Sequence, residues 1–271
     1  MALLLLVGCA ARAPTRSPQS ELSAAAQALI HIDDRTGNDG DVVLVARAAV
    51  DAVHVAQRWG SVLHPVTLRL HPTHDALEVA AHQKDVPWMR GWARFDEVEL
   101  ETPSSWGGHR APATVRELLR HEMTHVVMYQ QVSTRDGWTQ VNIPLWFREG
   151  MASVTSQQGY RRMTGEQLGE WLRQHPSHDP WMGADALGPD TQPVVYGAAH
   201  RAFERLLARI SDEGVRKILD GLRQSGEFEG AFTTAAGARP AVFLANFRRE
   251  LEQASALGDA CLLYTSDAAD E

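Results

Sequence analysis

The chain has only two cysteines among its 271 residues, so it cannot be a small domain held together by several disulfide bonds. Acidic residues outnumber basic ones, the formal net charge is −8 and no basic patch is evident, which argues against nucleic acid as a partner. The apolar run from Leu3 to Val7 is far shorter than the roughly 20 residues that a membrane-spanning helix needs. With 44% hydrophobic residues, the chain can nevertheless bury the core of one large or two small lobes, and we expect one globular unit.

The N-terminal segment differs in composition from the rest of the chain. Residues 6–9 (Leu-Val-Gly-Cys) look like a bacterial lipobox, in which the cysteine is lipidated. Residues 10–20 are rich in Ser, Thr, Arg and Pro, as expected of a tether. We therefore expect a lipoprotein-type signal and tether over residues 1–20. They would anchor the protein through Cys9 in the bacterial cell envelope, facing the periplasm or the exterior. The alternative is a stray apolar start with a buried or free Cys9.

The C-terminal segment is also unusual. Residues 261–271 (Cys-Leu-Leu-Tyr-Thr-Ser-Asp-Ala-Ala-Asp-Glu) look like a translated sequencing-library adapter. We expect this segment to be an artefact and exclude it from the fold. Without it Cys261 no longer counts, so an exported domain would depend on its core and any bound metal rather than on a disulfide bond.

Two histidines stand four residues apart in residues 121–125 (His-Glu-Met-Thr-His). Apolar residues recur at helical spacing around them, and residues 114–117 match a capping box, so we expect a helix. On a helix, His121 and His125 project from one face and can bind the same metal ion. Glu122, between them, is placed to take a proton from a metal-bound water instead of binding the metal itself.

A third metal ligand is expected in residues 144–152 (Pro-Leu-Trp-Phe-Arg-Glu-Gly-Met-Ala). Pro144 suits the first turn of a second helix, and Glu149 would lie on that helix. Catalytic zinc sites combine three protein ligands with one open position, so we expect one Zn²⁺ per chain, bound by His121, His125 and Glu149. The competing interpretation is a helix with two surface histidines and an unrelated glutamate.

Together these motifs resemble the gluzincin metallopeptidases, in particular the bacterial peptidase MA-like family, which shares its catalytic core with thermolysin. The resemblance implies an α+β fold with a small mixed or antiparallel sheet packed on the zinc helix, followed by an all-helical C-terminal lobe. It implies a catalytic domain over residues 21–260, rich in strands to about residue 143 and helical from about residue 144. It also implies that Glu122 is the catalytic base, and that the strand over residues 91–95 lies at the sheet edge and receives the peptide substrate.

Tyr196 and His200 are candidates for the donor that stabilises the oxyanion of the transition state, because related gluzincins use a tyrosine from the helical lobe. Ordinary packing is an equally good interpretation of each. The chain departs from the family where Ser153 replaces an aspartate that orients the first histidine, so Ser153 or a carboxylate elsewhere would have to replace it. The Gly-x-Met-Glu-Asn segment of the clan's aminopeptidases is missing, so exopeptidase activity is unsupported.

A zinc-dependent endopeptidase of the cell envelope, acting on peptides or proteins, is the resulting hypothesis. Two alternatives stay open: a catalytically silent zinc-binding scaffold, and a zinc hydrolase with a non-peptide substrate. Hydrophobic periodicity predicts further strands over residues 29–32 and 66–70, loop positions for His71 and His74, and helices over residues 42–59, 164–174, 194–210, 213–224 and 240–253.

Overall fold

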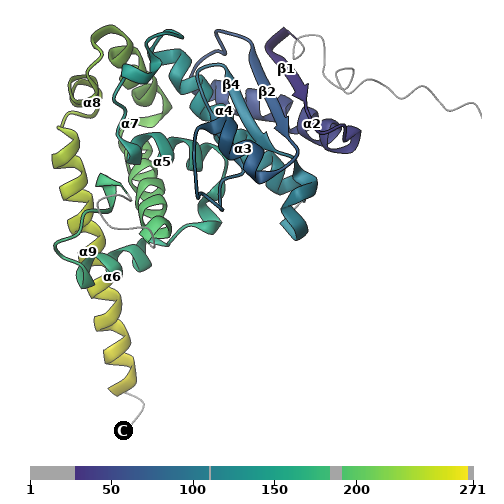
Figure 1. The fold of residues 1–271 in the computed structure, drawn as a ribbon. Helices are drawn as coiled ribbons and strands as arrows, with labels where there is room; N and C mark the ends of the chain where they lie inside the picture. The colour runs from purple at the N-terminus through teal and green to yellow at the C-terminus, as the bar shows by residue number, and fades with distance from the viewer. Residues whose placement is uncertain (1–27, 110, 184–190, 268–271) are drawn as a thin grey trace, which may run out of the picture.

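The computed structural model describes residues 28–109, 111–183 and 191–267. Cys9 and the predicted signal and tether lie outside these ranges. Within them, helices surround a small sheet, and every strand comes before residue 102 (Figure 1). The α+β class and the helical second half are therefore as predicted. No helix in the described part of the chain is both long and apolar enough to cross a membrane.

The sheet has four strands in the order β1-β2-β4-β3. Strands β1 (Ile30–Asp34), β2 (Val66–His71) and β4 (Glu97–Glu101) are mutually parallel, whereas β3 (Gly91–Ala93) pairs antiparallel with β4. The sheet is thus mixed. Its edge strand β3 is the one predicted over residues 91–95, although it ends at Ala93. In the described residues β3 pairs on one side only, so its other backbone edge has no strand partner.

One face of the sheet forms part of the main core. Alternation along β2 buries Val66, Leu68 and Leu70 on this face. Helix α4 (Pro112–Val132) contacts β3 and β4, and helix α2 (Asp39–Ala56) packs along α4 and against β1. The sheet therefore packs on the helix that carries the two histidines, as expected.

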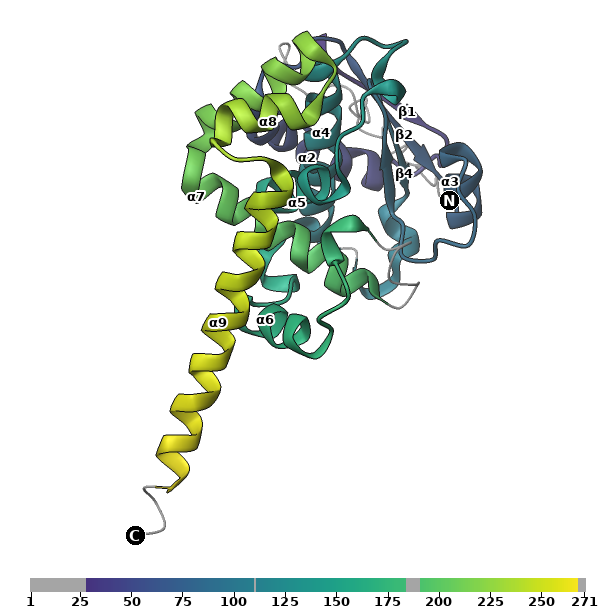
Figure 2. The same cartoon turned by 90° about the vertical axis from the view of Figure 1, so that its left-hand side faces the viewer.

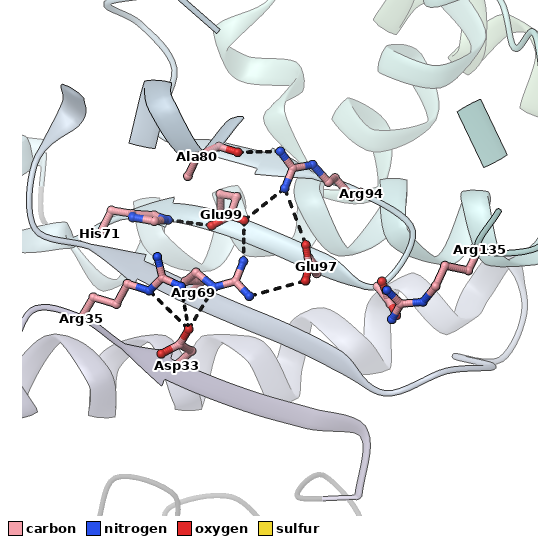
Figure 3. A network of polar contacts seen from close by, with 10 residues as sticks. Asp33, Arg35, Arg69, His71, Ala80, Arg94, Glu97, Glu99 and Arg135 are labelled. Atoms are coloured by element: carbon pink, nitrogen blue, oxygen red, sulfur yellow. Dashed lines mark hydrogen bonds and ion pairs between the residues drawn. The ribbon is translucent and has the colours of Figure 1, made fainter. Parts of the chain in front are cut away.

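The opposite face of the sheet is charged (Figure 3). Arg69 on β2 binds Asp33 at 2.9 Å and Glu99 at 2.6 Å, and Arg94 also reaches Glu99 at 3.2 Å. The prediction that His71 lies in a loop is wrong: it is the last residue of β2, and its Nε2 lies 2.6 Å from Glu99 Oε2. The register between the parallel strands β2 and β4 explains this position. Alternate residues of each strand point to the same face of the sheet, so the acidic side chains of β4 lie beside Arg69 and His71 of β2.

His74 is also misplaced by the loop prediction. It is the first residue of helix α3 (His74–Ala81), where Thr73 accepts a hydrogen bond from Ala76 N as the N-cap. Its Nδ1 lies 3.1 Å from Glu101 Oε2 of β4. Helix α3 therefore lies against β2 and β4 on the charged face of the sheet, opposite the face that packs on α4.

Two predicted helix starts differ from the structure. The capping box at Thr114 is wrong, because α4 begins at Pro112 with Ala111 as an N-cap that makes no side-chain hydrogen bond. Proline suits this first position since its fixed φ angle is helical and it has no N–H to satisfy. Glu117 instead accepts from Tyr160 and pairs with Arg161. Helix α5 (Leu145–Thr155) follows Pro144, which is the N-cap and not part of the first turn.

The helical half contains the predicted helices, although the last one extends beyond its predicted end at residue 253. Helix α6 (Gly165–Gln174) has a true capping box between Thr164 and Gln167. Helix α7 (Gln192–Ser225) is broken at Ser211, with φ 59° and ψ −179°, which separates the two predicted helices. Helices α8 (Phe228–Ala236) and α9 (Pro240–Asp267) complete the chain, and short 3-10 turns cover Gln57–Trp59, Pro103–His109, Trp138–Gln140, Gln158–Arg161 and Pro180–Met182.

Helix α9 packs along α6 and then continues beyond the body of the protein (Figure 2). Its backbone runs through residue 267, so the helix enters the segment that the sequence predicts to be an artefact. The artefactual origin of residues 261–271 stays a prediction, as do the domain boundaries 1–20, 21–260 and 261–271.

An aromatic cluster fixes α5 against the helical half. Trp146 and Phe147 of α5 are 2% and 0% exposed. The ring of Phe147 lies 5.3 Å from that of Phe203 on α7, and Trp146 packs against Phe232 and Phe243 of α8 and α9. Burying this much aromatic surface holds α5, and with it Glu149, in a fixed position relative to α7, α8 and α9.

Candidate metal centre

Helices α4 and α5 bring the three predicted ligands together. The Nε2 atoms of His121 and His125 lie 3.2 Å apart, and Glu149 Oε2 lies 3.3 Å from the first and 3.6 Å from the second. Among the described residues, this is the only group of at least three His, Cys, Asp or Glu residues placed to hold a metal ion. The two-helix arrangement predicted from the sequence is therefore present, and a metal ion can be bound by these three atoms.

Glu149 presents one oxygen to the histidines and the other to an arginine. Its Oε1 accepts a hydrogen bond from Arg148 Nε at 3.2 Å, while Oε2 faces His121 and His125. Burial alone would raise the pKa of Glu149, but His125 and His121 outweigh it and hold the pKa well below its usual value. The carboxylate is therefore ionised near neutral pH and available as a ligand.

Glu122 lies beside the triad and against the edge strand. It is buried, and the backbone N–H of Ala93 on β3 donates to its carboxylate. Burial raises the pKa of Glu122, although His121, His125 and the Ala93 N–H oppose this effect. A carboxylate with a raised pKa is a better proton acceptor, as general-base catalysis requires.

The two histidines lack the hydrogen bonds that usually orient metal ligands. Among the described residues, Nδ1 of His121 and Nδ1 of His125 are buried without a hydrogen-bond partner. Ser153 does not replace the missing aspartate, since its Oγ contacts His200 Nδ1 at 2.9 Å and accepts from Arg162 Nε at 3.2 Å. The ring of Tyr129 instead stacks on His125, with centroids 6.2 Å apart. Packing thus restrains at least one imidazole.

Tyr196 of α7 reaches the site from the helical half. Burial and the charge of Glu149 raise its pKa, whereas Arg148 and Arg162 oppose the rise. The phenol is therefore protonated at neutral pH and can donate a hydrogen bond. Its ring lies 6.2 Å from that of Trp88, which precedes β3, so these two side chains bring the two halves into contact near the triad.

The neighbours of the His200 side chain are not the three predicted metal ligands. Besides Ser153, it has Glu204 within ion-pair distance, with His200 Nε2 3.3 Å from Glu204 Oε1. The neighbouring His200 and Arg201 lower the pKa of Glu204 to about 2, although His200 Nε2 has no hydrogen-bond partner among the described residues. Both ring nitrogens of His200 thus have neighbours other than the triad, while Tyr196 has its electrostatic partners within the site. Tyr196 and His200 thus lie in different surroundings, which the sequence does not indicate.

Three residues of the site are not predicted by the sequence: Tyr129, Arg148 and Arg162. Gly91 is predicted only as part of the edge strand over residues 91–95. Arg148 could have been found, because it is a charged residue directly before the predicted ligand Glu149 in a mostly apolar motif. Tyr129 could also have been found, because it follows His125 by four residues on the same helix. Arg162 carries no such local signal, and the contact of Gly91 with Glu122 joins distant parts of the chain. No protein-family model matches the chain, and no curated protein matches it either. The function must therefore be argued from these residues and their geometry.

Proposed function

We propose that the protein is a zinc-dependent metallopeptidase with a thermolysin-like catalytic core. The observation that carries the proposal is the triangle of ligand atoms from His121, His125 and Glu149, with Glu122 beside it on the same helix as the histidines. Two nitrogen ligands and one carboxylate oxygen form the donor set of catalytic zinc in thermolysin-type enzymes.

The size of the triangle supports zinc. Zinc bonds to imidazole nitrogen and carboxylate oxygen are roughly 2.0–2.2 Å long, and a tetrahedron with such bonds has edges of about 3.3–3.5 Å. The observed separations of 3.2, 3.3 and 3.6 Å between the ligand atoms match these edges. Three ligands leave one position of the tetrahedron open, as hydrolysis requires.

The chain's own groups supply the remaining steps. When bound, zinc lowers the pKa of a water molecule and polarises the scissile carbonyl. Glu122 accepts the proton of the attacking water and delivers it to the leaving amine. The protonated hydroxyl of Tyr196 donates to the oxygen that gains charge in the transition state. Arg148 keeps Oε1 of Glu149 occupied, so that Oε2 is the atom left for the metal.

A peptide substrate fits the edge strand. Strand β3 has no strand partner on its outer edge among the described residues, and Glu122 lies directly against its Gly91 and Ala93. An extended peptide that adds to β3 would pass beside the metal-binding triad and the catalytic base. We propose endopeptidase action, in the bacterial cell envelope, with a lipid anchor at Cys9. Detergent partitioning of the wild type and of Cys9→Ser tests the anchor.

Metal analysis and a peptide library test the proposed activity. The purified protein should contain about one zinc per chain, hydrolyse some of the peptides, and lose this activity on chelation and regain it with zinc. His121→Ala should lose both zinc and activity. A protein that keeps one zinc and cleaves no peptide would instead be a silent scaffold or a hydrolase of another substrate class. Undiminished zinc in His121→Ala would refute the ligand assignment.

A further inference from the structure

In the described part of the chain, Arg162 is a half-buried cation with no carboxylate within ion-pair distance. Among the half-buried arginines of the described residues, every other one has a carboxylate within ion-pair distance, as shown by Arg69, Arg90, Arg94, Arg120, Arg148, Arg201 and Arg248. Arg162 donates only to neutral oxygens, namely Ser153 Oγ at 3.2 Å and Gln158 Oε1 at 3.0 Å. Burial of an unpaired charge costs free energy, which an anionic ligand would recover.

This guanidinium lies next to the metal centre. Ser153, which accepts from Arg162 Nε, follows Glu149 by one turn on α5. The guanidinium carbon lies over the ring of Tyr196, 5.3 Å from its centroid. The charge of Glu149 acts on Arg162 as well as on Tyr196, so Arg162 lies at the border of the site.

Arg148 adds a second guanidinium on the same side. It binds Glu149 through Nε, its side chain is 34% exposed, and its charge acts on Tyr196 together with that of Arg162. The two guanidinium groups balance the carboxylates of Glu122 and Glu149, so a bound dication would leave the site with a net positive charge. Guanidinium groups bind carboxylates with short, charge-assisted hydrogen bonds.

We propose that Arg162, assisted by Arg148, binds a carboxylate of the substrate. The inference deepens the proposed peptidase function and rests on it for the kind of substrate. The carboxylate has two possible sources, an acidic side chain near the scissile bond or the C-terminal carboxylate of a short peptide. Both present the same planar group to the guanidinium.

Four matched pools of N-acetylated heptapeptides distinguish the sources. The pools carry either a free C-terminal carboxylate or an amide, and contain either Asp and Glu or only Asn and Gln in their place. We expect wild-type initial rates below saturation to be roughly ten- to a hundredfold higher for one carboxylate-bearing pool than for its neutral counterpart, as charge-assisted hydrogen bonds typically give. Equal rates on all four pools would overturn the inference.

Arginine variants show which side chain causes the preference for carboxylate-bearing peptides. Arg162→Gln should remove most of it, Arg162→Lys should retain part because it keeps the charge, and Arg161→Gln should leave it intact. Arg161 is the matched control because it is the neighbouring arginine but pairs with Glu117, with 42% of its side chain exposed. A full preference in Arg162→Gln would exclude Arg162 as the binding group. If this variant fails to fold, the inference is still tested by the rates of the wild type on the four pools and by the preference of Arg162→Lys.

Calorimetry with the zinc-loaded Glu122→Gln variant measures how tightly each peptide pool binds, without any hydrolysis of the peptides. Tighter binding of a carboxylate pool without any cleavage by the wild type would refute the peptidase and support the carboxylate site. If the wild type cleaves all four pools at equal rates and the variant binds them equally tightly, the result would support the peptidase and refute the carboxylate site.

Discussion

Gly91 faces the carboxyl group of Glu122: a Cβ atom placed on Gly91 would lie 3.0 Å from Glu122 Cγ and 3.1 Å from Cδ and Oε1. Such contacts are shorter than ordinary van der Waals separations, and the neighbour that must move is the proposed catalytic base. The edge strand and the base are therefore packed so closely that only glycine fits between them without displacement.

Gly91→Ala should lower turnover while leaving metal content unchanged. The added methyl group would displace the Glu122 side chain by a few tenths of an ångström, and misplacement of a reacting group on this scale should cost roughly tenfold in rate. Gly230→Ala is the matched control, since a Cβ there meets nothing within 4 Å. Measured kcat should fall for the first variant and not the second. Equal kcat values would show that Glu122 can move without consequence.

Glu122→Gln should abolish measurable hydrolysis with zinc and fold retained. Glutamine keeps the size and can still accept from the Ala93 N–H, but it cannot take a proton from water. General acid–base catalysis typically contributes roughly a hundred- to ten-thousand-fold in rate. Turnover, metal content and melting temperature should be measured together. A variant with wild-type kcat would refute the proposed mechanism.

Arg148→Gln should weaken metal binding. Removing the partner of Glu149 Oε1 frees the carboxylate to rotate, and loss of a group that orients a metal ligand typically costs roughly ten- to a hundredfold in affinity. Competition with a zinc chelator measures the change. Arg161→Gln, which removes an arginine that pairs with Glu117 instead, should show wild-type affinity. An unchanged affinity in Arg148→Gln would mean that Glu149 is held by other contacts.

The metal triad could be predicted from the sequence because its signal is local. His121 and His125 need only a helix to face one ion, and Glu149 is marked by its own short motif. The same holds for the strands β1 and β2 and the helix α6. For α9 only the start is predicted correctly, since the helix continues from the predicted end at residue 253 to Asp267. Metal-ligand spacing and periodicity both depend on neighbours within a few turns, which a sequence displays directly.

The rest depends on contacts between distant residues. Gly91 meets Glu122 and Arg162 meets Ser153 only after the sheet and helices have packed, so neither position stands out in the chain. The capping box at Thr114 failed because Pro112, two residues earlier, offered a competing helix start. The position of His71 in β2 likewise depends on a partner from another strand, Glu99.

Ser153→Ala should reduce stability more than activity. Its Oγ is fully buried and contacts both His200 Nδ1 and Arg162 Nε, so its removal leaves two buried polar groups short of a partner. Such a loss typically costs about 1–3 kcal/mol. Denaturant unfolding should reveal it as a lower midpoint. A loss of zinc with no change in the unfolding free energy would instead show that Ser153 supports the metal ligands.

Tyr196→Phe should lower kcat with little change in fold or metal content. The ring would keep its contacts with Trp88 and Arg162, so the substitution removes the hydroxyl alone. Because burial and Glu149 raise the pKa of Tyr196, that hydroxyl is protonated at neutral pH and can donate to the developing oxyanion. Removal of one such donor typically costs roughly a hundred- to a thousandfold in kcat.

Tyr160→Phe is the control for this last substitution, because it removes the hydroxyl of an exposed tyrosine that contacts Glu117 instead of the site. Its kcat should equal that of the wild type. His200→Gln adds a second comparison: since His200 faces Ser153 and Glu204, its loss should affect stability before turnover. If kcat falls in His200→Gln and is unchanged in Tyr196→Phe, the oxyanion donor is His200, and the assignment made from the contacts of Tyr196 is wrong.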